Sequence, residues 1–389
     1  MQDLAAALSA RKHENLYRSR QALEGPQAVV VRVDGRDYLS FCSNDYLGLA
    51  SHPQVTAALK EGADRFGVGS GAAHLISGHS YAHEALEEEL AAFTGRPRAL
   101  LFSTGYMANL GVVAALTGRG DTVVEDRLNH ASLLDAARLS GAKLLRYAHN
   151  DMQSLAHRLA DGAGQRLVAC DAVFSMDGDC APLPVIQQLA VRHDAWVLVD
   201  DAHGFGVLGE QGRGWCVDQL GAGADNLVLM ATLGKALGTF GAFVAGSEAL
   251  VETLIQQART FIYTTAAPPA LAWATRTALA LVRQDDGLRE RLFANIAYFR
   301  ERASGLDLPL MDSHTAIQPL MVGDAGVALA LSAALRRRGV LVTAIRPPTV
   351  PQGAARLRIT FSARHTAAQI DRLLAALTES YRECTHVHA

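Results

Sequence analysis

Lysine is scarce in this chain of 389 residues, and other features are sparse as well. Only four lysines stand against 32 arginines, and the net charge is −3. That charge gives no reason to expect binding to nucleic acid or to an anionic membrane. The five cysteines are scattered without a CxxC pair, which predicts reduced thiols in a cytoplasmic protein and no disulfide or zinc site. No apolar run reaches about 18 residues, and the first residues lack a basic start, so we expect neither a transmembrane helix nor a signal peptide.

One of the four lysines, Lys235, lies among small and apolar residues. Val228 to Met230 are predicted as a short buried strand, and the glycines at 234, 238 and 241 let a ligand approach the backbone. Arginine stays charged, whereas a poorly solvated lysine amine can lose its proton and act as a nucleophile. A lone lysine in a glycine-rich turn is usually a surface residue. We interpret Lys235 as reactive because of the residues that accompany it.

Short apolar segments alternate with helical patterns from residue 98 to residue 245. This alternation predicts an α/β fold with a mostly parallel central sheet covered by helices on both faces. In such sheets ligands bind at the carboxyl ends of the strands. The predicted strands cover 99–102, 122–125, 143–147, 167–174, 196–200, 227–230 and 241–245. The predicted helices between them cover 105–116, 131–140, 152–159 and 184–193.

The flanking segments are predicted to form smaller pieces of structure. Residues 1–22 are predicted as a helix with Leu4, Leu8 and Leu16 on one side, and residues 29–41 as a hairpin around Asp34-Gly35. Residues 67–78 are too rich in glycine for a regular element and are predicted as a ligand-facing loop. The other predictions are helices at 53–66 and 84–93, a long helical region at 270–303 and a strand at 355–361. We expect an N-terminal segment (1–45), a large domain (46–255) and a smaller C-terminal α+β domain (256–389).

Six candidate residues follow the predicted strand ends and are therefore expected at one edge of the sheet. They are Gly105, His130, Ser175, Asp200, His203 and Lys235. If Lys235 forms a Schiff base, the aldehyde could belong to a substrate or to pyridoxal phosphate (PLP). PLP would also need an acid beside its pyridine nitrogen, a phosphate cradle and a group against its ring.

The residues after the strands can meet these needs. Asp200 could keep the pyridine nitrogen protonated, and His203 and Ser175 could bond the ring oxygen. His130 could stack on the ring and exchange protons near neutral pH. Taken singly, each of these residues could equally be an ordinary loop or helix-capping residue.

A phosphate cradle is predicted at the start of the helix that begins at Gly105-Tyr106. A helix N-terminus with free N–H groups binds phosphate readily. Thr232, three residues before Lys235, offers a hydroxyl to the same group. Many helices begin in this way, so the signal is weak by itself.

Four motifs together resemble the α-oxoamine synthases, which are PLP enzymes of fold type I, the aspartate-aminotransferase fold. The motifs are Asp126-Arg-Leu-Asn-His-Ala-Ser132, Val173-Phe-Ser-Met-Asp-Gly-Asp179, Asp200-Asp-Ala-His-Gly-Phe-Gly206 and Thr232-Leu-Gly-Lys-Ala-Leu-Gly238. The resemblance extends from Ser43-Asn-Asp-Tyr-Leu-Gly48 to Arg356-Leu-Arg-Ile-Thr360. It implies PLP as the cofactor and a homodimer with the site at the interface.

The resemblance also implies a role for each candidate residue. Lys235 would be the Schiff-base lysine and Asp200 the partner of the pyridinium. The remaining cofactor contacts would come from Gly105, Tyr106, His130, Ser175, His203 and Thr232. His130, Arg18 and Thr349 would contact substrate, and Arg358 would hold the amino-acid carboxylate, which arginine grips with two bonds. No metal site is implied.

Within the family, the chain is most similar to the branch that condenses L-alanine with a pimeloyl thioester in biotin synthesis. The signs are Asp-Asp-Ala-His-Gly at 200–204, the Asp after Met-Asp-Gly, and Ile345-Arg-Pro-Pro-Thr-Val-Pro351. The thioester could be carried by coenzyme A or by an acyl-carrier protein. After Gly69-Ser70 the family pattern would continue Gly-Gly-Ser, but this chain reads Gly71-Ala72-Ala73-His74, and Asp171 stands where the family more often has Glu.

Other readings of the same motifs stay open. Glycine C-acetyltransferase and serine palmitoyltransferase are other branches of the family. An aminotransferase would use the same fold for another reaction. A non-catalytic partner subunit would be expected to lack the lysine.

Overall fold

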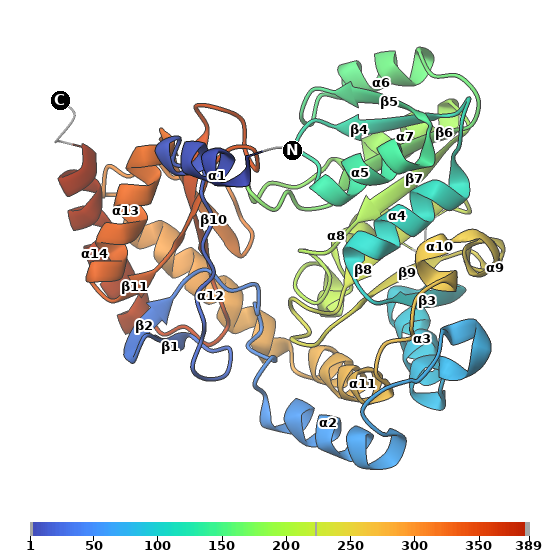
Figure 1. Ribbon diagram of the computed structural model, residues 1–389, viewed down its shortest axis with the longest axis horizontal. Coiled ribbons are helices and arrows are strands. Elements are labelled where there is room, and N and C mark those ends of the chain that lie inside the picture. The colour runs from blue at the N-terminus through green and yellow to red at the C-terminus, as the bar shows by residue number, and fades with distance from the viewer. Residues whose placement is uncertain (1–2, 222–223, 386–389) are drawn as a thin grey trace. The chain divides into compact units, whose positions relative to one another are not determined.

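The computed structural model describes residues 3–221 and 224–385, which form two compact units (Figure 1). The larger unit holds residues 51–175 and 180–286, and the smaller holds 1–50, 176–179 and 287–389. The domain boundaries expected from the sequence (1–45, 46–255 and 256–389) stay a prediction. The compact units differ from them mainly because residues 256–286 group with the larger unit.

A seven-stranded sheet forms the centre of the larger unit, in the order β3-β9-β8-β7-β6-β4-β5. Its strands are β3 (Arg98–Phe102), β4 (Thr122–Asp126), β5 (Lys143–Tyr147), β6 (Arg166–Asp171), β7 (Ala195–Asp200), β8 (Leu227–Thr232) and β9 (Ala242–Gly246). Strand β9 pairs antiparallel with both β8 and β3, and the other strand pairs are parallel. The prediction of a mostly parallel α/β sheet is confirmed. The predicted strand 167–174 was wrong at its end, because β6 stops at Asp171.

Helices cover both faces of this sheet. The helices of the larger unit are α2 (Pro53–Phe66), α3 (Tyr81–Thr94), α4 (Gly105–Leu116), α5 (Ala131–Ser140), α6 (Met152–Ala160), α7 (Leu183–Arg192), α8 (Trp215–Leu220), α9 (Glu248–Gln257), α10 (Arg259–Ile262) and α11 (Pro269–Gln284). Two short turns, η1 (His74–Gly78, π-helical) and η2 (Glu210–Gly212, 3-10), complete it.

The apolar side chains of the strands alternate between two buried cores. Leu167 and Ala169 pack into a core with α4, α5 and α9, whereas Val168 and Cys170 pack into another with α6 and α7. Successive residues of a strand point to opposite faces, so a strand covered on both sides must be apolar at every position. This explains the continuous apolar runs in the sequence.

The smaller unit contains two three-stranded sheets, ordered β1-β2-β11 and β10-β13-β12. Its strands are β1 (Val30–Val33), β2 (Arg36–Ser40), β10 (Ile317–Gly323), β11 (Val340–Leu341), β12 (Thr343–Ile345) and β13 (Ala355–Thr360). Its helices are α1 (Leu4–His13), most of α12 (Asp286–Ala303), α13 (Ala325–Arg337) and α14 (Ala367–Thr385). The predicted hairpin is confirmed, with Val33 opposite Arg36 across a turn in which Asp34 and Gly35 have φ of 51° and 70°.

One helix prediction was wrong in extent. The helix predicted over residues 1–22 is only α1, because Asn15 adopts a φ of 57° and ends the helical conformation. None of its residues is buried. The helical region predicted over 270–303 is confirmed and consists of α11 and α12, which meet at Asp285. No helix in residues 3–221 and 224–385 combines the length and apolar character needed to span a membrane.

Candidate active site

All eight residues predicted to contact a cofactor line one cavity of about 200 Å³ in the larger unit. They are Gly105, Tyr106, His130, Ser175, Asp200, His203, Thr232 and Lys235. Ser132, Asp171, Ala202 and Met230 complete the lining. Asp171, Asp200 and Thr232 are the last residues of β6, β7 and β8, Met230 lies two residues before the end of β8, and Gly105 and Tyr106 begin α4. The cavity therefore lies at the carboxyl edge of the parallel strands, where ligands bind in this architecture.

Lys235 lies in a short loop that joins β8 to β9. The Leu233 amide donates to the Gly241 carbonyl at 2.9 Å, and the Thr239 amide donates to the Leu233 carbonyl at 3.0 Å. Gly238 and Gly241 have φ of 67° and 114°, which side-chain-bearing residues rarely adopt. The loop holds the half-buried Lys235 so that its Nζ lies 3.0 Å from Nε2 of His203.

Asp200 presents a buried carboxylate to the cavity. Its Oδ1 accepts from the Ala202 amide at 3.1 Å, and its Oδ2 accepts from Asn109 Nδ2 at 2.8 Å. Asn109 is fully buried on α4, and its amide also donates to Ser132 Oγ at 2.8 Å. These neutral donors orient the carboxylate without neutralising its charge. It can therefore stabilise a protonated ring nitrogen, as PLP requires.

His130 caps the start of α5 and is held by Ser132. The Ser132 amide donates to His130 Nδ1 at 3.3 Å, and Ser132 Oγ lies 2.8 Å from the same nitrogen. Because Nδ1 accepts a bond, the neutral ring carries its proton on Nε2. His130 is exposed to solvent in part, yet desolvation of its ring lowers the pKa of the imidazole, which the negative charge of Asp200 opposes. The neutral form is therefore favoured near pH 7.

Asp171, on the neighbouring strand, is buried and is a different kind of carboxyl. Its Oδ2 accepts from the His130 amide at 2.9 Å. Burial, followed by the charge of Asp200, holds the pKa of Asp171 well above its usual range. A neutral Asp171 beside an ionised Asp200 avoids placing two negative charges in one buried site.

The start of α4 lies at the cavity, where an anion site was predicted. The Thr104 side chain accepts from the Met107 amide at 3.2 Å, which leaves the earlier amides of the helix facing outward. Thr232 Oγ1 accepts from the Gly234 amide at 3.3 Å and donates to the Gly241 carbonyl at 3.0 Å. The donor set of the cavity thus fits PLP: an amine, a buried carboxylate, a neutral imidazole and a helix N-terminus.

The smaller unit contains the three other residues predicted to contact substrate. Arg18 Nη2 donates to Thr349 Oγ1 at 3.3 Å, and both residues line a cavity of about 540 Å³. Arg358 is buried on β13, where its guanidinium donates to Asn44 Oδ1 at 3.0 Å and to Tyr46 Oη at 3.4 Å. Arg358 is not among the residues that line the 540 Å³ cavity.

Sequence reasoning missed Asn109 and Ser132, which connect Asp200 to His130. Ser132 is the last residue of the motif Asp126–Ser132, and Asn109 follows Gly105 by one turn of the predicted helix 105–116. A buried asparagine inside an otherwise apolar helix was the available signal, because a buried amide needs hydrogen-bond partners.

Comparison with known proteins agrees with this geometry. The family described as "Aminotransferase class I and II" matches residues 36–377. The 8-amino-7-oxononanoate synthase of Pseudomonas entomophila is 60% identical over 380 residues, which cover 97% of each chain.

Two solved structures show the same fold. A serine palmitoyltransferase variant from S. paucimobilis, with a PLP–myriocin adduct bound, has a TM-score of 0.92 at 30% identity and covers 98% of this chain and 97% of its own. The 8-amino-7-oxononanoate synthase of Francisella tularensis has a TM-score of 0.77 at 32% identity, covering 89% of this chain and 98% of its own. The predicted fold type I architecture is confirmed. The chain belongs to the class I and II aminotransferase family, in the α-oxoamine synthase group of PLP enzymes.

Proposed function

We propose that the chain is a PLP-dependent acyltransferase that condenses L-alanine with a pimeloyl thioester. The products are 8-amino-7-oxononanoate, CO₂ and a free thiol, and the reaction belongs to biotin synthesis. The observation that supports this proposal most strongly is that Lys235, Asp200, His203 and His130 line one cavity. The reaction is selected by relatives named 8-amino-7-oxononanoate synthase that are about 60% identical over nearly the whole chain.

The cavity residues would hold the cofactor in the following way. Lys235 would bind its aldehyde carbon, and Asp200 would keep a proton on its ring nitrogen. The first amides of α4, at Gly105 and Tyr106, would bind the phosphate with Thr232. His130 would stack on the ring, with His203 and Ser175 at the ring oxygen. When bound, PLP supplies an electron sink for the carbanion that forms at Cα of the amino acid.

Lys235 would also move a proton. As a free amine, Lys235 Nζ would take the proton from Cα of the amino acid. The contact of 3.0 Å between Lys235 Nζ and His203 Nε2 would hold that amine within the cavity. His130, with its Nε2 proton available, would donate a hydrogen bond to the oxygen of the attacked thioester carbonyl. The new C–C bond forms as the C–S bond breaks, and the thiol leaves before CO₂ is lost.

Residues of the smaller unit would orient the substrates. Arg358 would bind the alanine carboxylate, a pairing that suits a planar guanidinium with two donors. Arg18 and Thr349 would contact the acyl substrate, which coenzyme A or an acyl-carrier protein would carry. Large apolar side chains of the larger unit remain exposed, including Val68, Ile76 and Tyr263. Exposed apolar groups of this size support a homodimer.

Serine palmitoyltransferase is the alternative that a specific observation favours, because its solved structures match this fold with a TM-score of 0.92. Those structures are about 30% identical to this chain, half the identity of the Pseudomonas synthases. The amino acid used by the enzyme distinguishes the two reactions. We expect L-alanine to change the cofactor absorbance and glycine or L-serine to change it little.

The test is the absorbance spectrum of the purified protein, followed by thiol release. We expect a visible band that borohydride removes and that is absent in Lys235→Arg, since arginine cannot bond the aldehyde. Lys235→Arg should show no thiol release with L-alanine and a pimeloyl thioester. Lys143→Arg, which changes an exposed lysine, is the matched control and should keep full activity. Normal turnover in Lys235→Arg would refute the proposal, and a preference for glycine or serine would replace the named reaction.

A further inference from the structure

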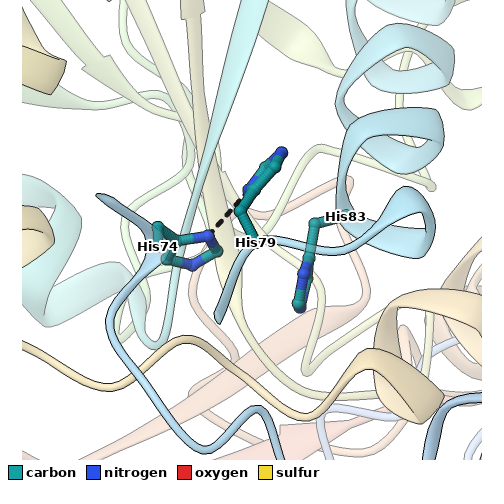
Figure 2. A group of neighbouring side chains, drawn as sticks. All are labelled: His74, His79 and His83. Atoms are coloured by element: carbon teal, nitrogen blue, oxygen red, sulfur yellow. Dashed lines mark hydrogen bonds between the residues drawn. The ribbon is translucent and has the colours of Figure 1, made fainter. Parts of the chain in front are cut away.

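Three histidines outside the active-site cavity lie together in the larger unit (Figure 2). His74 begins the turn η1, His79 follows that turn, and His83 lies in the first turn of α3. One ring nitrogen from each histidine lies within 4.8 Å of the others. His83 is buried, and His79 is half-buried. None of the three lines the cavity that contains Lys235.

The hydrogen bonds of His79 aim one of its nitrogens at His74. His79 Nε2 lies 2.9 Å from Glu84 Oε2. Because a carboxylate can only accept, Nε2 carries the proton, and Nδ1 is the acceptor of a hydrogen bond from Nδ1–H of His74. That Nδ1 lies 2.9 Å from Nδ1 of His74, as the dashed line in Figure 2 shows. In many metal sites a carboxylate holds the outer N–H of a histidine in this way and directs the inner nitrogen to the metal.

Ring packing and hydrogen bonds hold the rings of His74 and His83 in place. The His74 ring is stacked on Phe261, with centroids 5.0 Å apart. His83 Nδ1 accepts from the Ser80 amide at 3.0 Å, and its Nε2 donates to the Ala267 carbonyl at 2.7 Å. Metal binding through His83 would replace one of these two bonds, so His74 and His79 form the more accessible pair.

We propose that His74, His79 and His83 form a binding site for a divalent transition-metal ion such as Zn²⁺. Imidazole nitrogen is a preferred ligand of zinc, copper and nickel, whereas magnesium and calcium prefer oxygen. Zinc binds histidine at about 2.0–2.1 Å, so two nitrogens 2.9 Å apart subtend about 90° at the metal. An opening of about 0.5 Å between the two nitrogens gives the tetrahedral angle. A water molecule can take the fourth position.

The metal would join the loop at residues 67–78 to helix α3. This loop departs from the pattern that the family resemblance implies, because Gly71-Ala72-Ala73-His74 follows Gly69-Ser70 where Gly-Gly-Ser is expected. Because only the folded chain brings the three rings together, metal binding stabilises the folded state in proportion to the logarithm of metal concentration. The site stands apart from the proposed reaction, so either proposal can fail alone.

The test is a calorimetric titration of the chelator-treated holoenzyme with zinc chloride, with magnesium chloride as the comparison. We expect one Zn²⁺ per chain and no magnesium binding at this site. His74→Phe keeps an aromatic ring against Phe261, and His79→Gln keeps a polar partner for Glu84, but both remove a metal ligand. Each variant should weaken zinc binding at least about tenfold. His314→Gln alters a histidine whose side chain is 93% exposed and should bind zinc as the original chain does.

Two outcomes would overturn the proposal. One is the absence of stoichiometric zinc binding, and the other is zinc binding of equal strength in His74→Phe and His79→Gln. A zinc-soaked crystal provides a test that does not depend on variants. An anomalous peak between His74 and His79 supports the site, whereas peaks only at other histidines show adventitious binding and refute it.

Discussion

Replacing Asn109 with leucine tests whether this asparagine holds the carboxylate of the candidate site. Asn109→Leu keeps a side chain of similar size but removes the amide that donates to Asp200 Oδ2 and to Ser132 Oγ, both at 2.8 Å. A hydrogen bond between neutral groups contributes about 1 kcal/mol, and one to a charged group about 1.5–3 kcal/mol. The sum predicts that the free energy of unfolding falls by about 2.5–4 kcal/mol.

Equilibrium urea unfolding of the cofactor-free protein measures this loss. Asn226→Leu is the matched control, because the Asn226 side chain also makes two bonds, but with neutral partners, Ala195 O and Gln187 Nε2, both at 2.8 Å. About 2 kcal/mol is expected there. The difference between the two variants reports the contribution of the charged Asp200.

The same variant should bind PLP more weakly, because the Asp200 carboxylate loses the amide donor that orients it in the cavity. A loss of stability below about 1 kcal/mol together with unchanged PLP affinity would refute the role assigned to Asn109. Ser132→Ala tests the two hydrogen bonds of Asn109 separately, because it leaves the bond from Asn109 to Asp200 in place. The variant removes the hydroxyl that contacts Nδ1 of His130 but should leave PLP affinity nearly unchanged.

Two further predictions concern buried charge. Burial raises the pKa of Glu125 to about 8 from an ordinary value of 4.5, so the folded protein keeps a proton that the unfolded chain loses first. Stability should therefore fall as pH rises from about 5 to 8. Urea midpoints measured at both pH values should show a smaller fall for Glu125→Gln. An equal fall in the variant would contradict the raised pKa of Glu125. Arg356 is buried and pairs with Asp177 at 2.6 Å, so Arg356→Met should lower the free energy of unfolding by about 3 kcal/mol. Arg32→Met breaks an exposed pair with Asp37 and should lower the free energy of unfolding by less than about 1 kcal/mol in the same assay. Equal losses in the two variants would contradict the role assigned to burial.

The elements of the larger unit could be predicted because their signals are local. The predicted helices 105–116 and 131–140 and the strand 143–147 have the bounds observed in the structure. Their apolar patterns and capping residues lie within the segments themselves. The helix predicted over residues 1–22 failed because periodicity at Leu4, Leu8 and Leu16 does not show whether a partner surface exists. In the structure Leu4 and Leu8 are 68% and 48% exposed, and the helix ends before Leu16.

The side-chain contacts of the candidate site could be predicted only in part. The positions of the predicted strands and the rule on carboxyl ends were enough to place Asp200 and Lys235 at one edge of the sheet. The bond between Asn109 and Asp200 joins residues 91 positions apart, and that between Asn109 and Ser132 joins residues 23 apart. Such bonds depend on how α4 and α5 pack on the sheet, which no local pattern in a single sequence specifies. The residues of the smaller unit were placed by resemblance alone, and their roles remain predictions.

The antiparallel strand β9 has a consequence for the entropy of cofactor binding. Because β9 runs back along β8, the chain that carries Lys235 leaves the sheet edge and returns to it within nine residues, from Leu233 to Gly241. A parallel crossover would instead have required a connection of a dozen residues or more. The short return fixes the backbone of Lys235 before any ligand arrives. Little conformational freedom is then lost when the lysine becomes attached, so more of the binding free energy remains to hold the cofactor.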